Sequence, residues 1–237
     1  MGPRHEHGDA KEDGVGGDQH ETSSLAAEAS DLWAALLERL AERAAHEIRN
    51  PLNGAAVSIE VIRSRLQKNG AEVAGLGSFA RSAASELERA SRLVEAILAV
   101  ARPVTHPVDL IGLLRPLTVL YGEITVREGG MLEVLPATGG ADITADAFVT
   151  ESDAVVSRLM AASALESVSG RKGSHSVQLA RNGSIIEITV HSDSEGVSIP
   201  QAVESLGKEA GINCRKTPEA ITILLPALVP AQTRRKQ

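Results

Sequence analysis

Hydrophobic positions recur every three or four residues from about residue 24 to residue 69. This spacing lines up one apolar stripe on one side of an α-helix, and it predicts a single long helix that ends near Asn69 and Gly70. At 1.5 Å per residue such a helix is about 65 Å long, so its apolar side needs a partner. The stripe consists of Trp33, Leu37, Leu40, Ala44, Ile48, Leu52, Ala55, Ile59, Ile62 and Leu66.

A second stripe with the same spacing follows, and Arg102 and Pro103 stop it. The short glycine-containing link around residues 69–77 predicts an antiparallel helical hairpin. Each hairpin leaves a long apolar seam open, so two copies are expected to pair as a four-helix bundle in a homodimer. The second stripe consists of Phe79, Ala83, Leu87, Ala90, Val94, Ile97 and Ala101.

The pattern changes after Pro103, where short strand-like and helix-like segments mix without a regular β-α-β repeat. This mixture predicts an α+β sandwich in which helices cover a sheet. The expected helices span 108–120, 151–168 and 200–211, and the expected strands are EITVRE (123–128), MLEVLP (131–136), SVQLA (176–180), IIEITVH (185–191) and AITILLP (220–226).

The amino-acid composition limits the classes of function that the protein can have. The 237 residues carry a net charge of -7, and aromatic residues make up only 2%, so nucleic-acid binding is not expected. The single cysteine, Cys214, excludes a disulfide framework, and no apolar run reaches the length of a membrane span. We therefore expect a soluble cytoplasmic protein without membrane contact.

The ends of the chain are polar. Residues 1–23 are rich in Gly, Asp, Glu and His, which predicts a disordered acidic tail, with Ser23 or Ser24 as the N-cap of the first helix. Residues 231–237 form a short basic tail. The expected domains between these tails are the helical hairpin at 24–104 and the α/β unit at 105–230.

His46 departs from the apolar pattern of the first helix. It lies roughly 200° around the helix from Ala44 and Ile48, so it is expected to be exposed. Asn50 lies one turn further on the same face, and Glu47 is adjacent. A neutral imidazole is a good nucleophile near pH 7, and a neighbouring carboxylate can accept its proton or fix its tautomer. A solvated surface histidine is the plain alternative.

Two further residues belong to this cluster. Arg49 lies three positions after His46, and Pro51 removes a backbone donor inside the helix, which costs roughly 3 kcal/mol. A bend beside a reactive side chain is a reason to tolerate that proline.

The segment HEIRNPLNG, His46 to Gly54, resembles the phosphoacceptor box of sensor histidine kinases, H-E-[IL]-[RK]-N-P-L. The end of the second helix, LAVARP, resembles the family's L-x-x-A-R-P. The resemblance implies a dimerisation and histidine-phosphotransfer domain over residues 24–104. It implies that His46 takes the phosphoryl group, that Glu47 is its acid/base partner and that Asn50 assists transfer or hydrolysis. Receiver domains of response regulators are then expected to dock near His46.

The same resemblance implies that an ATP-binding (HATPase-like) domain follows the hairpin. In the family, a helix with N-[LI]-x-x-N-A holds Mg²⁺ and the phosphates, a D-x-G-x-G turn binds adenine, and a G-x-G-L-G lid closes over the phosphates. The outline of this domain is present, but its chemical residues are replaced and the lid is missing. The matching positions are Leu159 and Ser163 on the helix and Ser192, Ser194 and Gly196 in the turn.

These replacements have chemical consequences. Moving the alignment by one residue would place Asp193 at the aspartate, but Glu195 and Val197 would then replace both glycines. Leucine cannot coordinate Mg²⁺, and without a lid no backbone N–H groups reach the triphosphate. We therefore expect no nucleotide, no metal and no other cofactor.

The sequence thus favours a two-component phosphorelay protein, similar in kind to histidine phosphotransferases derived from kinases. His46 would exchange its phosphoryl group with an aspartate of a receiver domain, without ATP-dependent autophosphorylation. One alternative is an active histidine kinase with a divergent ATP and Mg²⁺ site. The other is a non-catalytic pseudokinase scaffold.

Overall fold

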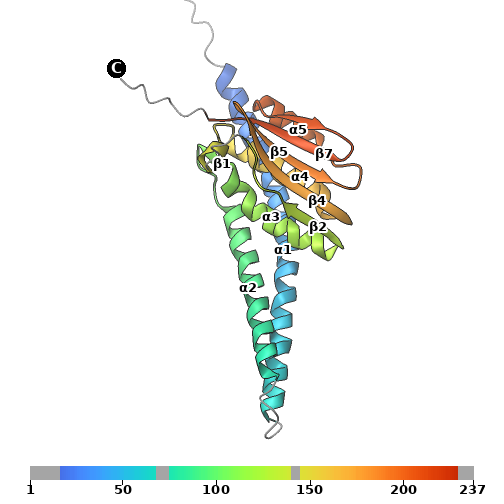
Figure 1. Ribbon diagram of the computed structural model, residues 1–237. Helices are drawn as coiled ribbons and strands as arrows, with labels where there is room; N and C mark the ends of the chain where they lie inside the picture. The colour runs from blue at the N-terminus through green and yellow to red at the C-terminus, as the bar shows by residue number, and fades with distance from the viewer. Residues whose placement is uncertain (1–16, 68–74, 140–144, 229–237) are drawn as a thin grey trace, which may run out of the picture.

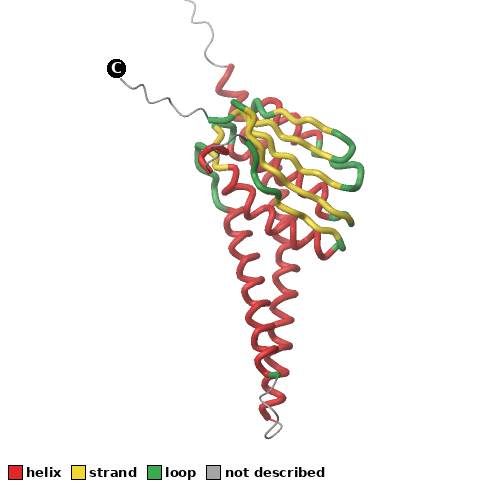
Figure 2. The backbone as a smooth tube through the Cα atoms, in the orientation of Figure 1, coloured by secondary structure: helices red, strands yellow, loops and turns green. Residues whose placement is uncertain are grey.

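A long helical hairpin carries an α/β domain at one end (Figures 1 and 2). The computed structural model describes residues 17–67, 75–139 and 145–228. The hairpin consists of α1 (Gly17–Gln67) and α2 (Leu76–Ala101), and α2 ends as predicted, with Arg102 extended at its C-cap. α1 runs through Pro51 as one helix. The sequence prediction of a hairpin is confirmed.

α1 begins earlier than predicted. It starts at Gly17, so the predicted N-cap at Ser23 or Ser24 and the predicted disorder of residues 17–23 are wrong, while residues 1–16 lie outside the described residues. Ala29 is fully buried, and Leu25 packs against the core formed with the α/β domain. This contact supports the first turns of α1 although their own composition is polar.

The α/β domain contains a five-stranded sheet in the order β2-β4-β5-β7-β6. β2 (Gly130–Val134) pairs with β4 (Gly173–Asn182) in parallel, and the other pairs are antiparallel. Burial alternates along the central strands, as expected for a sheet covered on one face. The remaining strands of this sheet are β5 (Ile185–Ser192), β6 (Asn213–Lys216) and β7 (Ala220–Pro226), and β1 (Val108–Asp109) and β3 (Val149–Thr150) form a separate pair next to the 3₁₀ helix Ala145–Phe148.

Three helices pack between the sheet and the hairpin: α3 (Leu110–Arg127), α4 (Ala154–Ser169) and α5 (Gln201–Glu209). α3 contacts both hairpin helices, and α4 contacts α1 on one side and the sheet on the other. α4 is therefore buried nearly all round, and most of its buried side chains are apolar. Figure 1 shows this layered end of the molecule, with the rest of the hairpin projecting from it.

One predicted strand is a helix. EITVRE, residues 123–128, was expected as a strand because it contains β-branched residues, but residues 123–127 form the last turns of α3. Leu117, Tyr121 and Ile124 are buried at helical spacing, so tertiary packing overrides the local preference. The hydroxyl of Thr125 donates to the carbonyl of Tyr121 at 2.6 Å, which removes the polar cost of burying it.

The predicted fold class is confirmed: the chain is an α+β protein, a helical hairpin followed by an α/β sandwich. The other predicted segments with helical spacing correspond to α3, α4 and α5, and the other predicted strands to β2, β4, β5 and β7. The four-residue β6 was missed, because only one apolar side chain, Cys214, interrupts its polar sequence.

Leu117 should be a major contributor to stability, because its side chain is fully buried where α3 joins the common core. We expect Leu117→Ala to lower the free energy of unfolding by about 2–5 kcal/mol. Val126→Ala, on the exposed side of the same helix, should change it by less than about 0.5 kcal/mol. Urea denaturation followed by circular dichroism compares the two; equal losses would contradict this assignment of the core.

Candidate phosphoacceptor site

His46 lies on the outer surface of α1, as the sequence pattern predicted. Its side chain is 57% exposed. Asn50 is exposed one turn further, and Val57, close to three full turns from His46, is exposed on the same face. A macromolecule can therefore approach His46 along this face of the hairpin.

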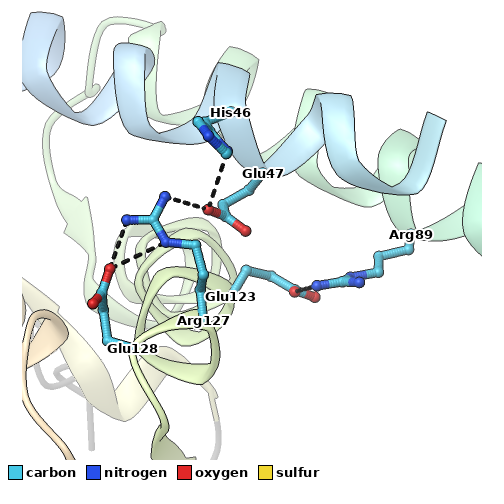
Figure 3. Close-up of polar contacts among 6 residues, drawn as sticks. All are labelled: His46, Glu47, Arg89, Glu123, Arg127 and Glu128. Atoms are coloured by element: carbon cyan, nitrogen blue, oxygen red, sulfur yellow. Dashed lines mark hydrogen bonds and ion pairs between the residues drawn. The ribbon is translucent and has the colours of Figure 1, made fainter. Parts of the chain in front are cut away.

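Glu47 lies beside His46 but is buried. Its side chain is only 2% exposed, and its Oε1 atom lies 4.0 Å from Nδ1 of His46. The same oxygen accepts a hydrogen bond of 3.0 Å from Nη1 of Arg127, at the end of α3 (Figure 3). The carboxylate next to the histidine is thus held by a guanidinium from the α/β domain.

Arg127 is itself fixed on its other side. Its Nε and Nη2 atoms donate to Oε1 of Glu128 at 3.1 and 2.6 Å. Hydrogen bonding to Glu128, reinforced by the charge of Glu47, raises the pKa of the Arg127 guanidinium, so it remains a cation. The fork of the guanidinium therefore bridges two carboxylates, one of which faces His46.

A second ion pair holds α3 against the hairpin. Glu123, one turn before Arg127, accepts a hydrogen bond of 2.9 Å from Nε of Arg89 on α2 (Figure 3). Two successive turns of α3 thus contact the two helices of the hairpin: Glu123 contacts α2, and Arg127 contacts α1. This arrangement fixes the α/β domain beside the face that carries His46.

The structure brings some of the predicted site residues together and separates others. His46 and Glu47 are neighbours, Asn50 and Arg49 are exposed, and Pro51 is buried within α1. Sequence reasoning missed Arg127, because the segment around it was expected to be a strand. The available signal was the i, i+4 pair of opposite charges, Glu123 and Arg127, which is typical of a helix face.

The helix positions expected to have lost Mg²⁺ and phosphate ligands lie inside the protein. Leu159 and Ser163 of α4 are both buried, within the layer between the sheet and α1. Arg158 of the same helix donates to the carbonyls of Val100 and Arg102 at 2.9 and 2.7 Å and lies 5.0 Å from the ring centroid of Trp33. α4 therefore joins the two parts of the chain.

The position expected for the adenine-binding aspartate is also buried. Ser192 bonds Nδ1 of His175 at 2.9 Å and the hydroxyl of Ser194 at 2.8 Å. His175 is buried, and its Nε2 atom lies 3.2 Å from the carbonyl of Arg171. This closed network satisfies its own polar atoms without a ligand.

The one retained glycine has a structural reason. Gly196 adopts a φ of 93°, which favours glycine. Its carbonyl accepts a hydrogen bond of 2.7 Å from Arg171, and its N–H donates to the carbonyl of Pro218 at 2.9 Å. The turn is thus held by protein contacts. The chain then runs to α5, which begins at Gln201.

Two findings bear on other classes of protein. In the described part of the chain, no group of three or more His, Cys, Asp or Glu side chains is arranged to hold a metal ion. Within the same ranges, none of the helices is both long and apolar enough to cross a membrane.

Comparison with known protein families identifies the hairpin. Residues 36–105 match the model of the His Kinase A (phospho-acceptor) domain. The match includes His46, the loop of the hairpin and all of α2. Residues 36–105 are therefore similar to the phospho-acceptor domain of histidine kinases. No curated protein sequence matches the chain significantly.

Solved structures of histidine kinases also align with the chain. Histidine kinase AdeS of Acinetobacter baumannii is 11% identical, with a TM-score of 0.40 over 76% of this chain and 97% of that one. The catalytic domain of histidine kinase ThkA is 14% identical, with a TM-score of 0.34 over 50% and 92%. ThkA in complex with response regulator TrrA is 18% identical, with a TM-score of 0.32 over 84% and 64%.

Ser192, at the position expected for the adenine-binding aspartate, should be required for folding stability. Ser192→Ala would leave Nδ1 of buried His175 without its partner, so we expect a loss of about 1–3 kcal/mol in the free energy of unfolding. Ser174→Ala, exposed on neighbouring β4, is the matched control and should have almost no effect. Chemical denaturation measures both; an unchanged Ser192→Ala midpoint would show that the network is dispensable.

Proposed function

We propose that the protein is a phosphorelay component that carries a phosphoryl group on His46. It exchanges this group with aspartates of response-regulator receiver domains and does not phosphorylate itself from ATP. One contrast carries the proposal: His46 is exposed, whereas Leu159, Ser163 and Ser192, at the positions expected to contact a nucleotide, are buried. The phosphoacceptor is open to a partner, and the nucleotide site is filled by the protein itself.

The chemistry at His46 is a reversible transfer. A ring nitrogen attacks the phosphorus of an aspartyl phosphate, the P–N bond forms, and the P–O bond breaks with its electron pair leaving on the aspartate carboxylate. Nδ1 is the ring nitrogen 4.0 Å from Glu47, so we assign the attack to Nε2. The ring then carries positive charge at Nδ1, facing the Glu47 carboxylate. Transfer to a second receiver reverses these steps.

The face around His46 suits a receiver domain. Asn50 can orient a phosphoryl oxygen or a water molecule one turn from the histidine, and Val57 adds an exposed apolar side chain further along the same face. Small apolar patches beside polar groups are typical of transient interfaces. Exchange with receivers places the proposed activity in the cytoplasm.

The hairpin also supports the proposed homodimer. The two helices expose apolar side chains in a stripe beside the face on which they pack: Leu52, Ile59 and Leu66 on α1, and Leu87, Val94 and Leu98 on α2. The α1 residues repeat every seven positions, as in a helical bundle seam, and they face away from His46. A second hairpin would cover this stripe and leave the phosphoacceptor exposed.

Phosphoryl transfer distinguishes this proposal from an active kinase and from a scaffold. We expect no labelling of the protein by [γ-³²P]ATP with Mg²⁺, and we expect labelling by one or more ³²P-phosphorylated receiver domains from a panel of the same organism. His46→Ala should abolish that labelling, since the attacking nitrogen is lost. Gel autoradiography measures the transfer.

His191→Ala is the matched control, because His191 is a partly exposed histidine on β5, far along the chain from the phosphoacceptor box. It should label like the wild type. Labelling from ATP alone, abolished by His46→Ala, would establish the active kinase instead. Binding of receivers without any transfer, unaffected by His46→Ala, would establish the scaffold.

Dimerisation makes a second prediction. Ile59 and Val57 are 53% and 64% exposed, but only Ile59 lies on the stripe proposed to face a second hairpin. Ile59→Glu should raise the dissociation constant of the dimer by roughly 100-fold or more, because a carboxylate without a partner is costly to bury. Val57→Glu should leave the dimer intact. Sedimentation equilibrium measures both; a monomeric wild type would refute the dimer.

A further inference from the structure

We infer that Arg127 is a positioning residue of the phosphotransfer site, supplied by the α/β domain to the histidine on the hairpin. The inference rests on the proposed function, because it concerns the phosphoryl group carried by His46. It assigns the second half of the chain a part in the chemistry, in addition to docking on the hairpin.

The contacts define what Arg127 positions. Its Nη1 atom donates at 3.0 Å to Oε1 of Glu47, the same oxygen that lies 4.0 Å from Nδ1 of His46. Figure 3 shows the three groups in sequence, from the imidazole through the carboxylate to the guanidinium. The bonds to Glu128 hold the guanidinium on the opposite side. Arg127 thus sets where the Glu47 carboxylate lies relative to the ring.

The charges explain why the site needs this cation. A phosphoryl group adds close to two negative charges at neutral pH. Glu47 already places a buried negative charge beside His46, so the phosphorylated state would bring like charges together. The Arg127 guanidinium offsets this repulsion while leaving the carboxylate in place to face the charged ring.

Two other arginines lie one turn from His46 on α1 itself. Arg43 donates to the hydroxyl of Ser169 on α4 at 3.1 Å, and Arg49 is exposed. Neither has a hydrogen bond to Glu47 among the contacts of the described residues, whereas Arg127 does. The geometry therefore selects Arg127 as the residue that acts through Glu47.

The test uses the whole 237-residue chain and two phosphoryl donors. Phosphoramidate phosphorylates histidine chemically, with ammonia as the leaving group, and a phosphorylated receiver domain tests transfer. We expect Arg127→Gln to slow transfer from the receiver by about 10- to 100-fold, mainly in kcat, because the positioned charge is lost. Peptide mapping by mass spectrometry confirms that His46 carries the group.

The decay of phosphohistidine supplies a readout that a docking role alone would not change. Hydrolysis of the P–N bond is faster when the imidazole is protonated. Removing the Arg127 charge favours protonation of the phosphorylated imidazole that faces Glu47. The pH profile of phosphohistidine decay should therefore shift toward higher pH. Arg127→Lys, which keeps the charge but not the fork, should restore most of the wild-type profile. Arg127→Met is a second neutral variant if Arg127→Gln does not fold.

Arg89→Gln is the matched control. Arg89 also binds α3, through Glu123, and is 34% exposed against 38% for Arg127. It feels the charge of Glu47 at longer range, but it forms no hydrogen bond or ion pair with Glu47 or His46 among the contacts of the described residues. It should lower stability without changing the decay profile or the transfer rate by more than about twofold. Wild-type decay and transfer rates in both neutral Arg127 variants would overturn the inference.

The two proposals fail separately. If phosphoramidate labels His46 but no receiver does, the relay function is wrong, and the decay profiles still decide the role of Arg127. If receivers label His46 and the neutral variants behave like the wild type, the relay stands and the role of Arg127 falls. If neither donor labels His46, both are refuted.

Discussion

The docking of the α/β domain on the hairpin is the constraint on which the rest of the structure depends. It is made largely by α1 and α3. The N-terminal half of α1 packs on α4 through Trp33, Arg39 and Arg43. The end of α3 binds α2 through Glu123 and α1 through Arg127. Glu47 could not be buried beside an exposed histidine without Arg127, because an unpaired carboxylate is costly to remove from water. The same interface therefore shapes the surroundings of His46 and fixes the two parts of the chain together.

This docking also explains why the positions that were expected to contact a nucleotide are buried. A helix that binds ligand needs one face open to solvent, whereas α4 packs on the sheet with one side and on α1 with another. Leu159 suits that environment, and a pair of asparagines there would need new hydrogen-bond partners. At the end of β5, the polar atoms of Ser192, Ser194 and His175 likewise bond to one another within the protein. The residues at the positions expected to contact a nucleotide therefore serve packing within the protein.

The contacts between the hairpin and the α/β domain combine buried apolar surface with a few hydrogen bonds and ion pairs. Arg158 ties α4 to the carbonyl groups at the end of α2, and Arg39 of α1 binds Glu166 of α4 with an Nη2–Oε2 distance of 3.3 Å. Exposed pairs such as the second contribute little stability, typically below about 1 kcal/mol. The buried apolar surface supplies most of the energy, and the arginines fix the relative orientation.

The sequence by itself determined the hairpin and the exposure of His46, because these depend on local periodicity and on residue identity. It also predicted most helices and strands, since their apolar spacing is regular. Only the tertiary structure decided that residues 123–127 are helical, that α1 begins at Gly17 and that Arg127 reaches Glu47. Each of these depends on contacts between segments far apart in the chain, which outweigh local preference and leave no periodic signal in the sequence.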